Sequence, residues 1–333
     1  GSRSRRSLGR PSCCGARRVR HDPSQRSPCG TCGTQRTLHG VRTIWNEEER
    51  KSRVVTTAHR KHVLGLSGGR DSAALAVYMR QHHPDLELEY FFTDTGKELP
   101  EVYEYLGQLE GFLGKPILRL NPDRDFDFWL KQYNDFLPSP QTRWCTRQLK
   151  LRPFEQWLQP LLDDGVTIYS YVAIRSDEEF REGYSSKNEQ LIIRLPLKEA
   201  GIDKSGVLDI LEGAGLGLPK YYQWRTRSGC TFCFFQQKIE WVRLKEHHPR
   251  AFEEAKAYEK VAVEHGSPFT WSRGESLEEL ERPERVAQIR KDHEQRIARA
   301  NSKAQPNPLR SNSEPLDIDD LYGKAKVCLA CHK

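Results

Sequence analysis

Short apolar runs alternate with stretches of helical periodicity over residues 62–211, and this alternation limits the possible folds more than any other feature of the chain. The apolar runs have the length and composition of buried strands and lie at 62–66, 86–92, 116–120, 166–173 and 191–197. The helical stretches lie at 71–81, 100–113, 125–133, 149–162 and 204–211. Strands that alternate with helices form a parallel sheet covered on both faces. We therefore expect an α/β fold with a doubly wound, parallel five-stranded sheet.

The two ends of the chain differ from this central part. Residues 1–55 are rich in Arg, Ser, Gly, Pro and Thr and lack apolar periodicity, which predicts a disordered arm. Residues 1–60 hold 14 Lys and Arg against 4 Asp and Glu, whereas the remainder holds 39 against 42. The arm is either a solvated tail or a segment that grips nucleic acid through its phosphates. Beyond the sheet, helical patterns at about 236–264 and 277–303 predict a C-terminal helical region, and a flexible tail follows at 305–333.

Composition also bears on the compartment. The sequence has no apolar run of the roughly 20 residues that span a bilayer and no visible secretory signal. Its nine cysteines are an odd number, which argues against a secreted disulfide framework. We expect a cytoplasmic protein with reduced thiols and no membrane partner.

The stretch "HVLGLSGGRDSAALAVYMRQ" (62–81) joins a strand, a glycine turn and a helix. Gly68 and Gly69 allow the backbone to turn tightly and to approach an oxyanion. N–H groups at the start of the following helix favour a phosphate, and Ser67, Arg70 and Ser72 add donors. The pattern is neither G-x-x-x-x-G-K-[ST] nor G-x-G-x-x-G. The alternative is an ordinary strand-to-helix turn in which Asp71 caps the helix.

Five ordered blocks resemble the adenine nucleotide alpha-hydrolase (PP-loop) superfamily, and in particular its phosphoadenosine phosphosulfate (PAPS) reductase family. "SGGRDS" is similar to the pyrophosphate loop S-G-G-x-D-S, with Arg70 where Lys is usual. "FFTDTGKELPE" resembles the D-T-G-x-E block around the adenosine, and "RWCTRQLKLRP" resembles R-W-C-C-x-x-L-K-x-x-P. "AIRSDEEFR" resembles G-I-R-x-D-E-S-x-x-R, and "SGCTFCFF" resembles the G-C-x-x-C-P segment of the iron–sulfur branch. Together the blocks cover about residues 60–260.

The resemblance implies a set of site residues. It implies that Ser67, Arg70, Asp71, Ser72, Asp94 and Arg175 take part in catalysis. It implies that nucleotide is bound by Ser67, Gly68, Gly69, Arg70, Asp71, Ser72, Asp94, Thr95, Gly96, Arg143 and Lys150. A carboxylate at Asp94, after the second strand, would hold a ribose hydroxyl or Mg²⁺, or alternatively cap the next helix. The basic residues near 143–152 suit a polyanionic ligand or form a solvated face.

The implied organisation has four parts. A basic arm occupies 1–55, a PP-loop nucleotide-binding domain occupies 56–225, a Cys-x-x-Cys segment with helices occupies 226–304, and a tail occupies 305–333.

Three cysteines match the metal-binding positions of the iron–sulfur reductases. Cys145, Cys230 and Cys233 stand at the matching places, but Thr146 replaces the second member of the first pair. Because iron–sulfur clusters normally take four thiolates, a fourth ligand would come from elsewhere or one iron would stay open. The resemblance thus implies a [4Fe–4S] cluster, with zinc or plain reduced thiols as alternatives.

The resemblance implies an ATP pyrophosphatase that uses ATP and Mg²⁺ to adenylate an acceptor before sulfur insertion. The single cysteine at 145 and the long helical end resemble the sulfur-transfer ATPases of bacterial DNA phosphorothioation systems. That resemblance implies a DNA backbone phosphate as acceptor, a cysteine desulfurase as sulfur donor and other phosphorothioation proteins as partners. A tRNA-thiolating enzyme, a PAPS or adenylylsulfate reductase, and an inactive nucleotide-binding subunit remain alternatives.

Overall fold

The computed structural model describes residues 60–179, 181, 188–227, 229–266, 270–272 and 274–303. The predicted arm at 1–55 and the tail at 305–333 lie outside these residues. The predicted boundary at 225/226 stays a prediction.

The sheet has five strands in the order β3-β2-β1-β4-β5, and every pairing is parallel. This confirms the predicted doubly wound sheet. Leu64 in the central strand is opposite Tyr90 on one side and Tyr171 on the other. The strands are β1 (Arg60–Leu66), β2 (Leu88–Thr93), β3 (Ile117–Leu120), β4 (Thr167–Tyr171) and β5 (Leu191–Arg194).

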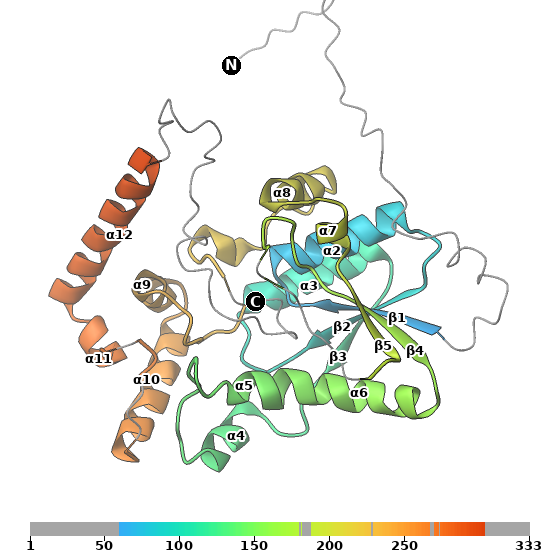
Figure 1. Cartoon of the computed structure of the whole chain (residues 1–333). Helices are drawn as coiled ribbons and strands as arrows, with labels where there is room; N and C mark the ends of the chain where they lie inside the picture. The colour runs from blue at the N-terminus through green and yellow to red at the C-terminus, as the bar shows by residue number, and fades with distance from the viewer. Residues whose placement is uncertain are drawn as a thin grey trace, which may run out of the picture. The chain divides into compact units, whose positions relative to one another are not determined.

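Helices cover both faces of the sheet (Figure 1). Successive side chains of a strand point to opposite faces, so neighbours in β1 enter different cores. Leu64 joins the larger core with α2 and α3, whereas Val63 joins a smaller core with Phe154 and Trp157 of α6. The helices of the first layer are α2 (Arg70–His82), α3 (Pro100–Leu113), α7 (Pro196–Glu199) and α8 (Lys204–Gly213), and α6 (Arg152–Asp163) lies on the other face.

The first three residues of the helix predicted at 149–162 belong to an irregular helical stretch that begins at Arg147. Pro153 has no N–H to donate to an ordinary helical bond. The N–H of Arg152 donates instead to the carbonyl of Arg147, five residues back. The elements between β3 and α6 are therefore α4 (Phe126–Gln132), the short α5 (Trp144–Thr146) and the π-helix η3 (Arg147–Leu151).

Prolines divide the C-terminal helices more finely than the sequence pattern predicts. Pro249 forces His248 out of helical geometry, to φ −136° and ψ 66°, so the stretch predicted at 236–264 is two helices. Pro283 starts the last helix after a similar break. Trp241 and Phe252 from this region lie in the same core as Leu64 of the sheet. The helices are α9 (Lys238–His247), α10 (Pro249–Glu264), α11 (Leu277–Leu280) and α12 (Pro283–Lys303).

None of the helices in the described part of the chain is long and apolar enough to cross a membrane.

Candidate functional site

The strand order reverses next to β1, and this topology fixes where a ligand is expected. The chain builds β1, β2 and β3 toward one edge and then crosses over to place β4 and β5 on the other side. Doubly wound sheets bind ligands at the carboxyl ends of the strands, at such a reversal. The loop after β1 and the segment after β4 flank this point. They contain the predicted residues 67–72 and Arg175, respectively.

The glycine turn between β1 and α2 has the geometry that the sequence predicts. Gly68 has a φ of +68°, a conformation that side-chain-bearing residues rarely adopt. A Cβ on Gly68 would lie 2.5 Å from Cγ1 of Val102 in α3, well inside normal contact distance. Gly69 is the N-cap of α2, and no side chain caps the helix. The alternative in which Asp71 caps the helix is therefore wrong.

Two serines set the shape of this turn. The Oγ atoms of Ser67 and Ser72 lie 3.0 Å apart, and the Ser67 N–H donates to Ser72 Oγ at 3.1 Å. Ser72 is buried and also donates to the Gly69 carbonyl at 3.2 Å. Ser72 thus stabilises the loop from inside, whereas Ser67 is only half-buried.

Arg70 lies at the mouth of the turn under an aromatic ring. Its guanidinium carbon is 5.3 Å from the centre of the Tyr222 ring, and its Nε is 3.8 Å from Asp71. The side chain of Arg70 is largely buried. Its delocalised positive charge is therefore held beside the phosphate loop in surroundings that screen it poorly.

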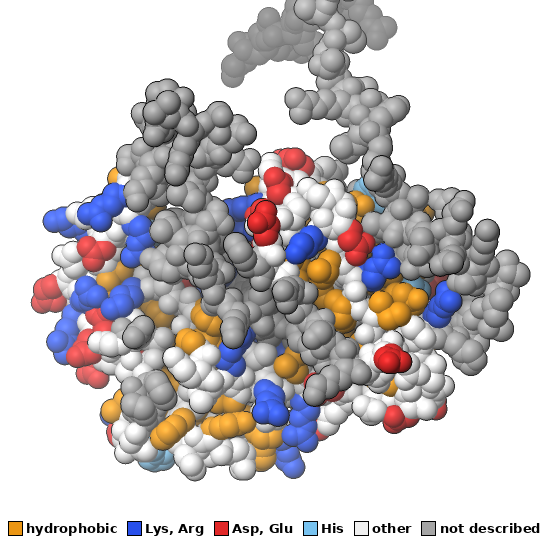
Figure 2. Space-filling view, in the orientation of Figure 1, with side chains coloured by type: hydrophobic (Ala, Val, Ile, Leu, Met, Phe, Trp, Pro, Cys, Tyr) orange, Lys and Arg blue, Asp and Glu red, His pale blue; other side chains and the backbone are white. Residues whose placement is uncertain are grey.

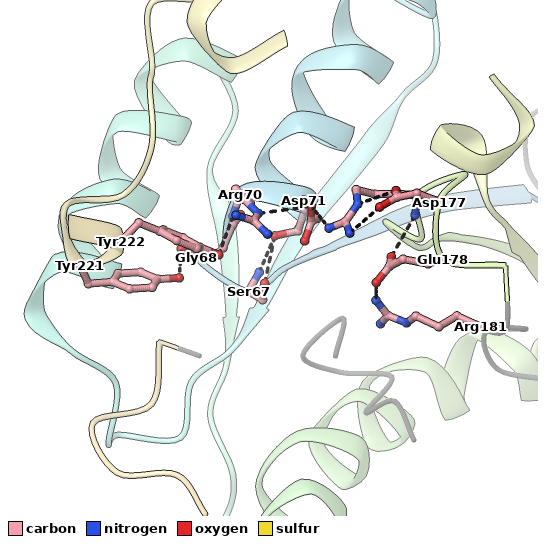
Figure 3. A network of polar contacts seen from close by, with 12 residues as sticks. Ser67, Gly68, Arg70, Asp71, Asp177, Glu178, Arg181, Tyr221 and Tyr222 are labelled. Carbon is pink, nitrogen blue, oxygen red and sulfur yellow. Dashed lines mark hydrogen bonds and ion pairs between the residues drawn. The ribbon is translucent and has the colours of Figure 1, made fainter. Parts of the chain in front are cut away.

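A chain of charges connects the turn to the segment after β4 (Figure 3). Arg175 donates to Asp71 at 3.0 Å and to both oxygens of Asp177, at 2.9 and 3.0 Å. Burial disfavours the charged form of Arg175, but the surrounding carboxylates outweigh it and hold its pKa above the ordinary value. Because its donors face these carboxylates, Arg175 orients Asp71 rather than pointing a free charge at a phosphate.

Arg181 extends the same network and offers donors to a ligand. Its Nη1 donates to Glu178, whose other oxygen accepts from the Arg175 N–H at 3.1 Å. Its Nε and Nη2 are buried and have no hydrogen-bond partner among the described residues. Buried donors of this kind fit a bound anion.

Two tyrosines of η4 (Lys220–Gln223) complete the turn, and sequence reasoning missed both. The hydroxyl of Tyr221 donates to the Gly68 carbonyl at 3.1 Å, and the Tyr222 hydroxyl lies 3.5 Å from the Arg70 N–H. Burial raises the pKa of Tyr221 well above its ordinary value, so this hydroxyl stays protonated and donates. They lie about 150 positions beyond the loop in a segment without a motif, so no local pattern marked them.

The block after β2 shapes its own turn. Asp94 accepts from the Gly96 N–H at 2.9 Å and from the Tyr103 hydroxyl at 2.7 Å. Thr95 is buried and donates to Glu98 at 3.0 Å, while Gly96 is exposed with a φ of +70°. Asp94 therefore orders the turn before α3, where the sequence left its role open.

Arg143 and Lys150 contact residues around the Cys-x-x-Cys loop. The guanidinium carbon of Arg143 is 5.5 Å from the centre of the Phe235 ring. The Nζ of Lys150 lies 3.6 Å from Glu98 and 3.6 Å from the Sγ of Cys230. These contacts place both side chains next to residues around the Cys-x-x-Cys loop.

The Cys-x-x-Cys loop pairs with the block after β2. Leu99 donates to the Gly229 carbonyl at 2.7 Å, and Thr231 donates to the Lys97 carbonyl at 2.6 Å. Buried Arg225 donates to the Cys230 carbonyl at 2.7 Å, which fixes the loop from behind.

One valine connects this loop to the phosphate loop. A Cβ on Gly229 would lie 2.5 Å from Cγ2 of Val102, the residue whose Cγ1 packs against Gly68. The phosphate loop and the cysteine loop therefore pack against the same side chain.

The three cysteines do not form the predicted metal centre. Among the described residues, no group of three His, Cys, Asp or Glu side chains is placed to hold a metal ion. Cys145, Cys230 and Cys233 are all half-buried, and the Sγ of Cys230 donates to the Glu98 carboxylate at 3.5 Å. Lys150 and Glu98 thus both lie within hydrogen-bonding distance of the Cys230 thiol. The donor set does not fit an iron–sulfur cluster or a three-thiolate zinc site in this arrangement. The other six cysteines lie outside the described residues.

Comparisons with known proteins agree with the resemblance to the PP-loop superfamily that the sequence blocks indicate. The chain is 25% identical over 219 residues to the uncharacterized protein MJ0066 of Methanocaldococcus jannaschii, covering 64% of this chain and 43% of that protein. It is 24% identical over 202 residues to the tRNA-specific 2-thiouridylase MnmA of Enterococcus faecalis, covering 53% and 52%. The chain spans about half or less of the curated relatives it matches.

Among solved structures, a phosphate complex of PAPS reductase from Candida auris matches with a TM-score of 0.42 and 14% identity, covering 55% of this chain and 87% of that one. The family model of the phosphoadenosine phosphosulfate reductase domain matches residues 61–186, the part of the chain that contains β1 to β4 and the glycine turn.

Proposed function

We propose that this protein is an ATP pyrophosphatase that activates an acceptor by adenylation for sulfur insertion. The observation that carries the proposal is the glycine turn after β1. Gly68 has a positive φ, and no side chain caps the start of α2, which carries Arg70 and Asp71. A helix start without a side-chain cap, next to buried cationic groups, favours a polyphosphate.

The reaction needs two displacements. An acceptor oxygen attacks the α-phosphorus of ATP, the bond to the bridging oxygen breaks, and pyrophosphate leaves with that electron pair. The terminal sulfur of a donor persulfide then attacks the activated acceptor centre, AMP leaves with the acceptor's original oxygen, and a thiol reductant cleaves the remaining S–S bond and supplies the two electrons. Catalysis of such steps rests mainly on positioning and on stabilising charge.

The described side chains supply both. Arg70 lies beside the turn, where its charge would balance phosphate charge, and the Arg181 donors that have no partner among the described residues suit a second anionic group. Arg175 is a positioning residue, because it holds Asp71 at 3.0 Å.

Magnesium fits this arrangement through Asp71. Mg²⁺ is usually bound by one or two carboxylates together with water and substrate phosphates, so it does not require a group of three protein ligands. Asp71 faces Arg175 with Oδ1, and about a fifth of its side chain is exposed. When bound, the ion would neutralise charge on the phosphates. The roles proposed here include no iron–sulfur centre, because the cysteines do not fit one.

The acceptor that we propose is a DNA backbone phosphate, with a cysteine desulfurase as the sulfur donor. This part rests on the resemblance of the motifs to phosphorothioation ATPases. A tRNA acceptor is the second candidate, supported by the similarity to a tRNA 2-thiouridylase. A PAPS reductase is the third, supported by the family match over residues 61–186.

The test is a product assay. The protein is incubated with ATP and Mg²⁺, with and without single-stranded DNA or tRNA, and AMP and pyrophosphate are quantified. We expect both products in equal amounts and their loss in Asp71→Asn. Asp209→Asn, an exposed aspartate in α8, is the matched control and should keep full turnover. Release of ADP and phosphate, or unchanged turnover in Asp71→Asn, would contradict the proposal. PAPS-dependent oxidation of thioredoxin without AMP release from ATP would favour the reductase.

A further inference from the structure

A pocket lies at the carboxyl end of β3, between α4 and the start of α6. It has a volume of about 480 Å³, within the range of small-molecule sites. Its lining comes from the β3–α4 loop, α4, η3 and α6, and none of the phosphate-loop residues 67–72 takes part.

The walls of this pocket pair arginines with aromatic rings. The guanidinium carbon of Arg124 is 4.8 Å from the Phe128 ring centre, and that of Arg152 is 5.6 Å from the Trp129 ring centre. Phe128 and Trp129 contact each other edge to face at 5.4 Å. Both rings are half-buried and both arginines are exposed. Aromatic faces beside exposed cations are the combination that binds bases and phosphates of single strands.

Two amide side chains add hydrogen-bonding groups to the same pocket. Gln148 donates to the Tyr133 hydroxyl at 3.2 Å, and Gln156 donates to Asp123 at 3.2 Å. These contacts hold the amides in place, with their carbonyl oxygens as additional acceptors. Glutamine amides pair with the edges of bases. Figure 2 shows hydrophobic and basic side chains next to one another over the region of α4 and the start of α6.

The pocket lies close enough to the phosphate loop for one substrate to contact both. All strands are parallel, so β1 and β3 end at the same edge of the sheet, with only β2 between them. Two strand spacings correspond to about 10 Å across the sheet. A strand with one base in this pocket could therefore place another of its groups near the glycine turn.

From this geometry we propose that the pocket binds a base of a single-stranded nucleic acid, so that the acceptor strand lies across the carboxyl edge of the sheet. The inference deepens the proposed function, on which it rests for the identity of the acceptor. DNA and RNA share the stacking and phosphate chemistry, and the experiment separates them.

The test measures fluorescence anisotropy of a labelled 12-nucleotide single strand, as DNA and as RNA of the same sequence, without ATP. Stacking of one base is worth about 1–3 kcal/mol, so Trp129→Leu should weaken binding roughly 5- to 160-fold. Arg152→Gln, an exposed change that leaves the core intact, should weaken binding several-fold. Arg80→Gln is the matched control, because Arg80 is exposed and lies 5.1 Å from the Phe112 ring in a similar pair elsewhere.

If the protein binds one of the two strands more tightly than the other, and Trp129→Leu and Arg152→Gln weaken that binding, the proposed pocket is supported. The preferred strand then identifies the class of acceptor. No binding of either strand, equal binding by Arg152→Gln and the control, or displacement of the strand by excess ATP would overturn it. Strand binding without any AMP release from ATP would refute the proposed function and leave the pocket standing.

Discussion

The packing of Val102 against two glycines makes a quantitative prediction about how the cysteine loop and the phosphate loop are connected. A Cβ on Gly229 would lie 2.5 Å from Val102 Cγ2, more than 1 Å closer than a normal carbon contact of about 3.5–4.0 Å. Overpacking of this kind costs about 1–3 kcal/mol, so Gly229→Ala should lower the free energy of unfolding by that amount.

Trimming the valine should relieve the clash. Val102 is fully buried, and we expect Val102→Ala alone to cost about 2 kcal/mol through lost contacts and a small cavity. In the double variant the added methyl fills part of that space. The combined loss should therefore be at least about 1 kcal/mol smaller than the sum of the single losses, a coupling expected of residues in contact.

Gly68 provides the comparison. A Cβ there would meet the same valine at 2.5 Å, but Gly68 also has a φ of +68°. Alanine with a positive φ costs about 1–2 kcal/mol even where there is room for its methyl group. Val102→Ala should therefore restore less stability to the Gly68→Ala variant than to the Gly229→Ala variant.

The assay is urea unfolding followed by tryptophan fluorescence for the wild type, the three single variants and the two double variants. ATP turnover is measured on the same samples, and Gly68→Ala should remain inactive in both backgrounds. If Gly229→Ala costs the same with Val102 and with alanine at 102, the shared packing is wrong. Equal rescue of both glycine variants would refute the role of the positive φ.

Three further outcomes are expected. Burial, with a smaller contribution from the charge of Arg60, lowers the pKa of His62 from 6.5 to about 4. The neutral ring therefore contributes its full stability above pH 6.5, and this contribution is lost as the pH falls toward 4. After allowing for the partial exposure of His62, the loss should be about 1–2 kcal/mol. His62→Phe should flatten this slope in urea titrations between pH 7 and 4.5. Tyr221→Phe removes the donor to the Gly68 carbonyl, and a loss of about 1–2 kcal/mol in thermal unfolding together with a higher KM for ATP is expected. Asp177→Asn takes one carboxylate from the buried cation of Arg175 and, being partly exposed itself, should cost about 1–2 kcal/mol, whereas an unchanged melting temperature would show that the pair contributes nothing.

The fold was largely predictable because its signals are local. Apolar runs of strand length, helical periodicity and a glycine turn are each contained within about 20 residues, and they correctly predict five parallel strands and a turn at 67–69. The departures are also local in cause. Pro153, Pro249 and Pro283 interrupt helical stretches. Hydrophobic periodicity alone does not register that a proline lacks the backbone N–H that donates the helical hydrogen bond.

The site was only partly predictable because its contacts are not local. The sequence by itself determined that residues 62–81 form a strand, a glycine turn and a helix, since neighbouring residues and their backbone preferences suffice for that. Only the tertiary structure decided which distant side chains surround the turn: Tyr221 on the Gly68 carbonyl, and Arg175 on Asp71 rather than on a ligand. It also placed Lys150 and Glu98 beside Cys230, where the resemblance to the iron–sulfur reductases implied a metal. The physical reason is that hydrogen bonds and ion pairs depend on distances of a few ångströms, and for residues about 80 to 150 positions apart these distances are set by the packing of whole elements.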